Sequence, residues 1–323
     1  DPIVREAIAR APSTAVSRYP GVYATDLKCA IAEYHGVAPD NVVTGCGSDD
    51  IIDSAIRAFA DAGDAVAYPT PTFGMIPIFT RMNTCVPRPV ALRDEFQLDV
   101  EAMLRTGGSI NYVCNPNNPT GTPLNLNDIL RLECEAAGIT LLDEAYADYA
   151  AENFGARAVA TEKLIVLRTF SKAFGLAGMR VGYALANATI AREIEKSRGP
   201  YKVGGIAESA ALAVLTTGLA RVRRSIEQTV ENRERLAARL ADLGFVVAPS
   251  AANFLLIAVP GAPAAAWAAA LGRRDIGVRP FTGIPGMGDS IRVTVGPWPI
   301  METFLSALRA IAAEFQATRS VGA

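Results

Sequence analysis

The chain has 323 residues, half of them hydrophobic, with a formal net charge of −2 and an isoelectric point near 5.7. A chain of this length buries about three quarters of its unfolded surface and exceeds the usual size of one core, so we expect two unequal domains. No basic run is present to neutralise nucleic-acid phosphates or to bind an anionic membrane. Nucleic acid and membrane are therefore excluded as partners, and a small molecule is favoured.

The numbers of cysteine and histidine residues limit which covalent, metal and catalytic sites the chain can form. The five cysteines are odd in number and form no Cys-x-x-Cys pair, so neither disulfides nor zinc is expected, and a reducing cytoplasm fits best. No signal segment precedes the first residues and no apolar run approaches the roughly 20 residues that cross a bilayer, which predicts a soluble protein. The only histidine, His35, precedes Gly36 at a predicted helix end. Catalytic triads with histidine and multi-histidine metal sites are thereby excluded.

Strands and helices alternate over the first two thirds of the chain. A helix is predicted over 25–34, and a strand over 41–45 leads through a glycine turn into a helix over 51–60. Further strands are predicted over 65–68, 110–114, 139–142, 164–168 and 181–185. This alternation predicts an α/β fold in which helices cover both faces of a mostly parallel sheet.

The last third of the chain has a different pattern. A long helix is predicted over 219–243, followed by strands over 253–257 and 291–295 and a last helix over 301–315. A loop around 258–270 enters an alanine-rich helix between the two strands. We expect a smaller α+β domain here, and divide the chain into a large domain, 22–218, and a small domain made of 1–21 and 219–323.

A glycine-rich turn after the strand at 164–168 contains Ser171, Lys172 and, eight residues after the lysine, Arg180. Burial and a nearby cation favour the neutral form of a lysine, which is the nucleophile that condenses with an aldehyde. An arginine binds a phosphate through two parallel hydrogen bonds. Pyridoxal 5′-phosphate carries both groups, so the turn indicates this cofactor; an ordinary exposed turn is the alternative.

Polar segments after other strands supply further groups at the edge of the sheet where open α/β sheets bind ligands. Asp143 follows the apolar run 139–142 and offers the anion that keeps a pyridine nitrogen protonated, unless it is a helix N-cap. Asn118 and Tyr146 can donate to the cofactor's ring oxygen, although Asn-Pro-Asn-Asn-Pro-Thr-Gly alone is typical of a turn. Phe73 stacks on the ring or belongs to the core.

The segment Gly45-Cys-Gly-Ser-Asp opens a helix, where free backbone N–H groups form an anion site for the cofactor phosphate. A plain tight turn is the alternative for this segment. The residues predicted to bind the phosphate are Gly47, Ser48, Asp49, Thr169, Ser171 and Arg180.

Together these segments resemble pyridoxal-phosphate enzymes of the aspartate-aminotransferase fold (fold type I), and within them the histidinol-phosphate aminotransferase group. The resemblance covers nearly the whole chain. It rests on Arg18-Tyr-Pro, Gly-Cys-Gly-Ser-Asp-Asp, Asn-Pro-Asn-Asn-Pro-Thr-Gly, Asp-Glu-Ala-Tyr, Ser-Lys-Ala-Phe-Gly-Leu-Ala-Gly-Met-Arg, Pro200-Tyr and Ile-Arg-Val-Thr-Val-Gly.

The resemblance implies roles for individual residues. Lys172 binds the cofactor as a Schiff base, and Asp143 pairs with the pyridine nitrogen. Tyr19 reaches the cofactor phosphate of the neighbouring subunit in a homodimer with two shared active sites. Tyr201 matches an active-site tyrosine, and Arg292 matches the arginine that binds the substrate's anionic group. A second arginine, Arg279, is either another anion contact or a solvated side chain.

The implied activity is transfer of an amino group between an amino donor and a 2-oxo acid. An aromatic or other amino-acid aminotransferase, a decarboxylase or synthase on the same scaffold, and a cofactor-binding sensor remain alternatives. This sequence departs from the group at three places that affect substrate choice. The Asn-Glu-Asn-Pro-x-Gly segment of the group is missing from it. Where the group has Tyr-Asn-Val-Asn it has Tyr201-Lys-Val-Gly, and where the group has Glu-Asn it has Pro297-Trp-Pro.

Overall fold

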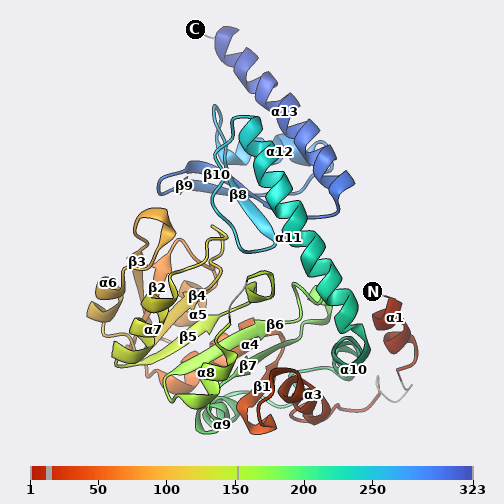
Figure 1. Cartoon of the computed structure of the whole chain (residues 1–323). Helices are drawn as coiled ribbons and strands as arrows, with labels where there is room; N and C mark the ends of the chain where they lie inside the picture. The colour runs from red at the N-terminus through yellow and green to blue at the C-terminus, as the bar shows by residue number, and fades with distance from the viewer. Residues whose placement is uncertain (1, 12–16, 151–152, 322–323) are drawn as a thin grey trace.

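The computed structural model describes residues 2–11, 17–150 and 153–321. A seven-stranded sheet forms the centre of the larger part (Figure 1), with the strand order β1-β7-β6-β5-β4-β2-β3. Its strands are β1 (Val42–Gly45), β2 (Ala65–Thr70), β3 (Val86–Ala91), β4 (Ile110–Cys114), β5 (Ile139–Asp143), β6 (Leu164–Thr169) and β7 (Gly182–Leu185). Strands β2 to β6 are parallel, and β7 is antiparallel to both of its neighbours. The predicted α/β class with a mostly parallel sheet is confirmed.

Helices cover both faces of this sheet, which explains why its central strands are apolar throughout. Every residue of β4 and β6 is buried, as expected of strands that lack a solvent face. One face packs against α4 (Gly47–Phe59), α5 (Ile76–Met82) and α9 (Ala188–Ser197). The other face packs against α3 (Thr25–His35), α6 (Val100–Arg105), α7 (Leu126–Glu135), α8 (Gly155–Ala160) and α10 (Gly205–Ala213).

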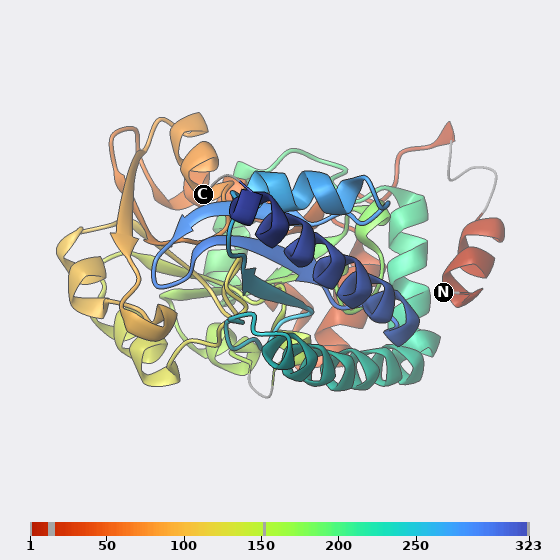
Figure 2. The same cartoon turned by 90° about the horizontal axis from the view of Figure 1, so that it is seen from above.

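A second, three-stranded antiparallel sheet has its own core. Its order is β8 (Phe254–Ala258), β10 (Gly288–Thr294) and β9 (Arg279–Ile284). Three helices pack on it: α11 (Leu219–Asp242), α12 (Ala264–Gly272) and α13 (Trp298–Val321). Seen from above, α12 and α13 lie over this sheet (Figure 2). This arrangement is the α+β unit expected from the last third of the sequence.

The helix that joins the two parts is unusually long. Helix α10 continues through a π-helical turn, Val214–Gly218, into α11, so that one helix runs from Gly205 to Asp242. By length and composition alone it could cross a membrane, which corrects the expectation that no apolar run is long enough. About a third of its apolar window is buried, and α10 packs against α3. A single helix of this kind is weak evidence for a membrane span, because the core helices of water-soluble proteins pass the same test of length and composition.

The N-terminal helix α1 (Pro2–Ala9) packs against α10, and its Val4 belongs to the core beneath the large sheet. This contact lies on the larger part of the molecule, although the sequence analysis grouped 1–21 with the small domain. The proposed division at residue 218 falls inside the continuous helix, between the π-helical turn and α11. The division into 22–218 and 1–21 plus 219–323 stays a prediction.

Candidate active site

A cavity of about 230 Å³ lies at the carboxyl ends of the parallel strands. This is where loops after successive strands converge in open α/β sheets. The predicted site residues that line it are Ser48, Asp49, Phe73, Asn118, Asp143, Tyr146, Thr169, Ser171, Lys172 and Arg180. Segments spread over about 130 residues of sequence therefore meet in one cavity, as the sequence analysis expected.

Asp143 ends β5 and is only 4% exposed. Its Oδ1 accepts a hydrogen bond from the backbone N–H of Ala145 at 3.0 Å, and its Oδ2 accepts one from the hydroxyl of Tyr112 at 2.7 Å. Burial raises the pKa of Asp143, and these two hydrogen bonds oppose that rise. The buried carboxyl group is thus held by two donors, and no helix starts at it.

Lys172 lines the same cavity, and its surroundings favour the uncharged amine. Its Nζ is 5.3 Å from the centre of the Tyr146 ring. Burial lowers the pKa of Lys172, and the nearby guanidinium of Arg292 lowers it further, while Asp143 opposes the change. A larger fraction of neutral amine at neutral pH follows, and a neutral amine is the nucleophilic form of lysine.

An anion site is built at the start of α4. Gly47 has φ +79°, and a Cβ there would lie 2.8 Å from Nη2 of Arg180. The arginine donates to Asp49 Oδ2 at 3.3 Å and to Ser171 Oγ at 3.5 Å. The guanidinium of Arg180 lies beside the free N–H groups at the start of the helix. Donors of these two kinds are the ones that bind a phosphate. Thr169 also lines the cavity, and its Oγ1 accepts from the backbone N–H of Ser171 at 3.1 Å.

Two carboxylates in the first turn of α4 would repel an anion, but each is paired with a cation. Asp49 is paired with Arg180. Asp50 accepts from Lys202 Nζ at 2.6 Å and from the backbone N–H of Cys46 at 3.1 Å. The second pair joins α4 to the segment around residue 201, and it also fixes the turn before the helix.

The small sheet contributes the predicted substrate arginines. Arg292 on β10 donates to Oδ1 of Asn118, and its Cζ lies 4.9 Å from the centre of the Phe254 ring. Arg279 on β9 is its direct cross-strand partner. Burial lowers the pKa of Arg292, and the charge of Arg279 acts in the same direction. Two cations are therefore placed side by side next to the cavity.

Tyr19 and Tyr201 do not line the cavity in this single chain. Their rings stack on each other with centroids 4.6 Å apart, and they are 82% and 40% exposed. Sequence reasoning also missed residues that do line it: Cys114, Ala145 and Ala177. Cys114 ends β4 directly before the Asn-Pro motif, so its place in the strand was a usable signal.

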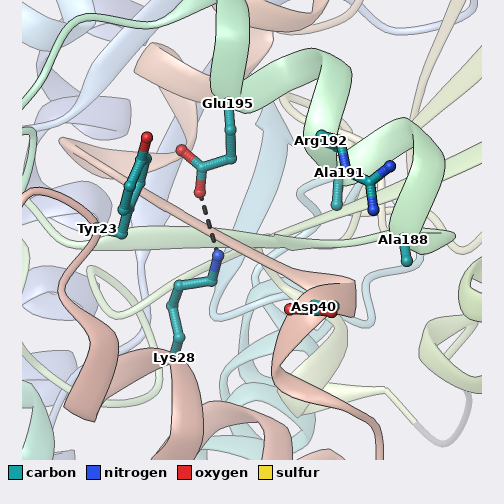
Figure 3. Close-up of a pocket in the computed structure, with 7 residues that line it drawn as sticks. All are labelled: Tyr23, Lys28, Asp40, Ala188, Ala191, Arg192 and Glu195. Atoms are coloured by element: carbon teal, nitrogen blue, oxygen red, sulfur yellow. Dashed lines mark hydrogen bonds and ion pairs between the residues drawn. The ribbon is translucent and has the colours of Figure 1, made fainter.

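Figure 3 shows a second cavity, which shares no lining residue with the first. It is lined by Tyr23, Lys28, Asp40, Ala188, Ala191, Arg192 and Glu195. Lys28 Nζ donates to Glu195 Oε1 at 3.3 Å, and Arg198 pairs with the other carboxylate oxygen at 3.2 Å. Glu195 is thus paired with two cations, although its Oε2 accepts no hydrogen bond within the described residues, and none of the predicted site residues lines this cavity.

Comparison with known proteins agrees with this geometry. The family model for aminotransferase class I and II matches residues 2–311. The histidinol-phosphate aminotransferase of Thermoanaerobacter pseudethanolicus is 36% identical over 302 residues, which cover 92% of this chain and 85% of the relative. That of Roseiflexus castenholzii is 38% identical over 306 residues, which cover 91% of this chain and 81% of the relative.

Among solved structures, the histidinol-phosphate aminotransferase of Sinorhizobium meliloti in complex with pyridoxal-5′-phosphate aligns with a TM-score of 0.86 and 26% identity, covering 98% of this chain and 88% of that chain. The resemblance inferred from the motifs is confirmed by both kinds of comparison. The chain belongs to the aminotransferase class I and II family.

Proposed function

We propose that this aminotransferase transfers an amino group between histidinol phosphate and a 2-oxo acid, with pyridoxal 5′-phosphate as its cofactor. The observation that carries the proposal is the single cavity in which an amine of lowered pKa, a buried carboxylate and an arginine-bearing anion site meet. Relatives 36% and 38% identical in sequence, and one solved structure with a TM-score of 0.86, bear the name histidinol-phosphate aminotransferase.

The residues fit the cofactor by the chemistry of their donors. The start of α4 with Arg180 offers a cradle for a phosphate, and a Cβ on Gly47 would intrude into it. Asp143 supplies the carboxylate for a protonated pyridine nitrogen, and Asn118 and Tyr146 offer donors for the ring oxygen. Phe73 lines the same cavity, where an aromatic ring can stack on a planar heterocycle.

When bound, pyridoxal phosphate supplies an aldehyde for the amine of the substrate and a ring that accepts the electrons released at the substrate's α-carbon. Lys172 Nζ would hold the cofactor and, once free as an amine, would take the proton from that carbon and deliver it to the cofactor. Its lowered pKa suits a base at neutral pH. Asp143 keeps a proton on the ring nitrogen throughout. A 2-oxo acid is aminated when Lys172 moves its proton in the reverse direction.

The paired arginines favour a phosphate over a carboxylate at the distal end of the substrate. Arg292 alone suits either anion, because both accept two parallel hydrogen bonds. Arg279 lies directly across the strand pair and adds a second charge, which matches the higher charge of a phosphate ester. The assembly that completes the site is a homodimer, in which the exposed Tyr19 reaches the cofactor phosphate in the partner's cavity. The enzyme works in the cytoplasm, without membrane or nucleic acid.

A donor comparison tests the proposed substrate. The holoenzyme is mixed in single half-reactions with histidinol phosphate, an aromatic amino acid or glutamate, and the rate of amino-group transfer is measured. We expect histidinol phosphate to react fastest. Arg279→Ala should lower kcat/KM for histidinol phosphate about tenfold or more, since hydrogen bonds to charged groups contribute about 1.5–3 kcal/mol.

Arg88→Ala removes an exposed arginine on the edge strand β3 and serves as the matched control. A faster reaction with the aromatic amino acid, and no selective loss in Arg279→Ala, would assign the enzyme to a different amino donor. Lys172→Ala should show no turnover with any donor, and activity in that variant would refute the catalytic assignment itself.

A further inference from the structure

Tyr112 lies beneath the cavity without lining it. It is in the middle of β4, which pairs with β5 in parallel (Figure 1), and its Cα partner is Leu141, two residues before Asp143. Cα partners across this pair include Cys114 and Asp143, so Tyr112 and Asp143 are diagonal neighbours on one face of the sheet. The tyrosine is fully buried, and its hydroxyl donates to Asp143 Oδ2 at 2.7 Å.

The hydroxyl is not needed to fill space. A phenylalanine has nearly the same volume, and the surroundings of the Tyr112 ring are apolar side chains of the sheet and of α4. A hydroxyl buried among such side chains is unfavourable unless it is hydrogen-bonded. The thiol of Cys114 also lies close to the hydroxyl, but the hydroxyl donates to the carboxylate of Asp143, and a hydrogen bond to a charged group is stronger than one between neutral groups. The position therefore calls for a donor to Asp143.

Asp143 depends on few donors. Burial raises its pKa, and the hydrogen bond from Tyr112 is the largest influence in the opposite direction, ahead of the N–H of Ala145. The titratable groups that face Asp143 are Tyr112, Cys114, Lys172, Asp49 and Tyr146. Of these, Asp49 raises the pKa of the carboxyl and Lys172 lowers it. Once Lys172 binds a cofactor, its amine stabilises the Asp143 carboxylate less. The hydrogen bond from Tyr112 then becomes more important for keeping the pKa of Asp143 low.

We propose that Tyr112 is a positioning residue, which keeps Asp143 ionised and fixes the orientation of its carboxylate for the ring nitrogen of the cofactor. The inference rests on the proposed function of Asp143. A carboxyl group that retains its own proton cannot act as the counter-ion of a protonated pyridine, and one that rotates freely pairs with it less well. Loss of the hydroxyl should therefore weaken cofactor binding most where Asp143 begins to take up a proton.

The test measures the affinity of the purified apoenzyme for pyridoxal 5′-phosphate by absorbance or fluorescence titration between pH 5.5 and 9. For Tyr112→Phe we expect about tenfold weaker binding at low pH, narrowing as the pH rises, because a net hydrogen bond to a charged group has this magnitude. Tyr183→Phe is the matched control. It removes another buried hydroxyl on the same sheet, one that contacts His35 at 2.9 Å and lies outside the site. It should bind the cofactor like the wild type at every pH.

Two further variants separate failure of this inference from failure of the proposed function. Asp143→Asn should lose most of its cofactor affinity; if it binds and transaminates normally, the role of Asp143 itself is wrong. If Asp143→Asn is impaired but Tyr112→Phe matches the wild type at every pH, the proposal for Tyr112 is overturned alone.

The double variant Tyr112→Phe with Asp143→Asn tests whether the tyrosine acts through the carboxylate. The charge that the hydroxyl stabilises is then absent, so we expect the double variant to bind the cofactor no more weakly than Asp143→Asn. An additional tenfold loss in the double variant would show that the tyrosine acts independently of the carboxylate, and would overturn the proposal.

Discussion

His35, the only histidine, has a structural role. It ends α3, and Gly36 closes the helix in a left-handed conformation with φ 66°. A ring nitrogen of His35 lies 2.9 Å from the hydroxyl of Tyr183. Burial, together with the charge of Arg168, lowers the pKa of His35 to about 4. The imidazole is therefore neutral in the folded protein at neutral pH, and it lies outside the cavity, as the sequence analysis expected of a helix C-terminal residue.

This shift predicts a pH-dependent stability. The pKa in the unfolded chain is close to the ordinary value of 6.5, so between about 4 and 6.5 the unfolded state binds the extra proton. The free energy of unfolding should fall as the pH decreases through this window. His35→Gln should remove that part of the dependence, and thermal unfolding of both proteins at pH 4.5 to 8 measures it. Parallel pH profiles for the two proteins would contradict the assignment.

At the scale of single elements, the central strands could be predicted from the sequence and two strands could not. The apolar runs of β4, β5 and β6 are buried on both faces and needed no further information. Strand β3 contains Pro87 and Pro89, which argue against a strand; it exists because it is an edge strand paired only with β2. Strand β9 has four exposed residues out of six, so it lacks an apolar signal.

The same distinction holds for the site. Lys172, Asp143, Asn118 and Arg180 follow strands whose carboxyl ends meet, so their convergence could be predicted from the order of the elements. The place of Arg279 beside Arg292 depends on the pairing of β9 with β10, which the sequence pattern does not specify. The contact of Tyr112 with Asp143 depends on the register of two neighbouring strands, and a shift by one residue would turn the ring to the other face.

The turn between β1 and α4 requires close approach of the backbone of β7. A Cβ on Gly182 would lie 2.3 Å from the backbone nitrogen of Ser48 and from the carbonyl carbon of Gly47. Gly182→Ala should therefore displace the phosphate cradle and destabilise the fold by about 1–3 kcal/mol, the usual result of overpacking. Thermal unfolding and cofactor titration would both detect the change.

Gly272→Ala is the control for this variant. A Cβ there meets nothing within 4 Å, and the residue lies in α12, far in sequence from the cradle. The control should melt and bind cofactor like the wild type. Normal cofactor affinity in Gly182→Ala would show that the cradle does not depend on this contact.

At the scale of the whole molecule, the two sheets meet at the cavity. Arg292 of the small sheet donates to Asn118 of the large one, and the ring of Tyr146 meets that of Phe254 at 5.0 Å. The backbone N–H of Ala251 also donates to the carbonyl of Gly121 at 2.8 Å. The arginine that we propose to bind the substrate is thereby in direct contact with Asn118, which we propose to bind the cofactor.

A mixing experiment tests the shared active sites that we propose for the homodimer. Lys172→Ala lacks the amine, and Tyr19→Ala lacks the exposed tyrosine that we place in the partner's site, so each should be nearly inactive alone. A refolded 1:1 mixture should recover about a quarter of wild-type activity, because half of the dimers are hybrids with one intact site. No recovery, in a mixture shown to contain hybrids, would place Tyr19 in the site of its own chain, and wild-type activity of Tyr19→Ala alone would place it outside any site.

The most direct measurement of the central claim concerns the lysine. The protein is reconstituted with pyridoxal 5′-phosphate, reduced with borohydride, digested and analysed by peptide mass spectrometry. We predict that one peptide, the one containing Lys172, carries the added mass of the reduced cofactor, and that Lys172→Ala carries none. Label that is absent, or that falls on another lysine such as Lys28 or Lys202, would contradict the account.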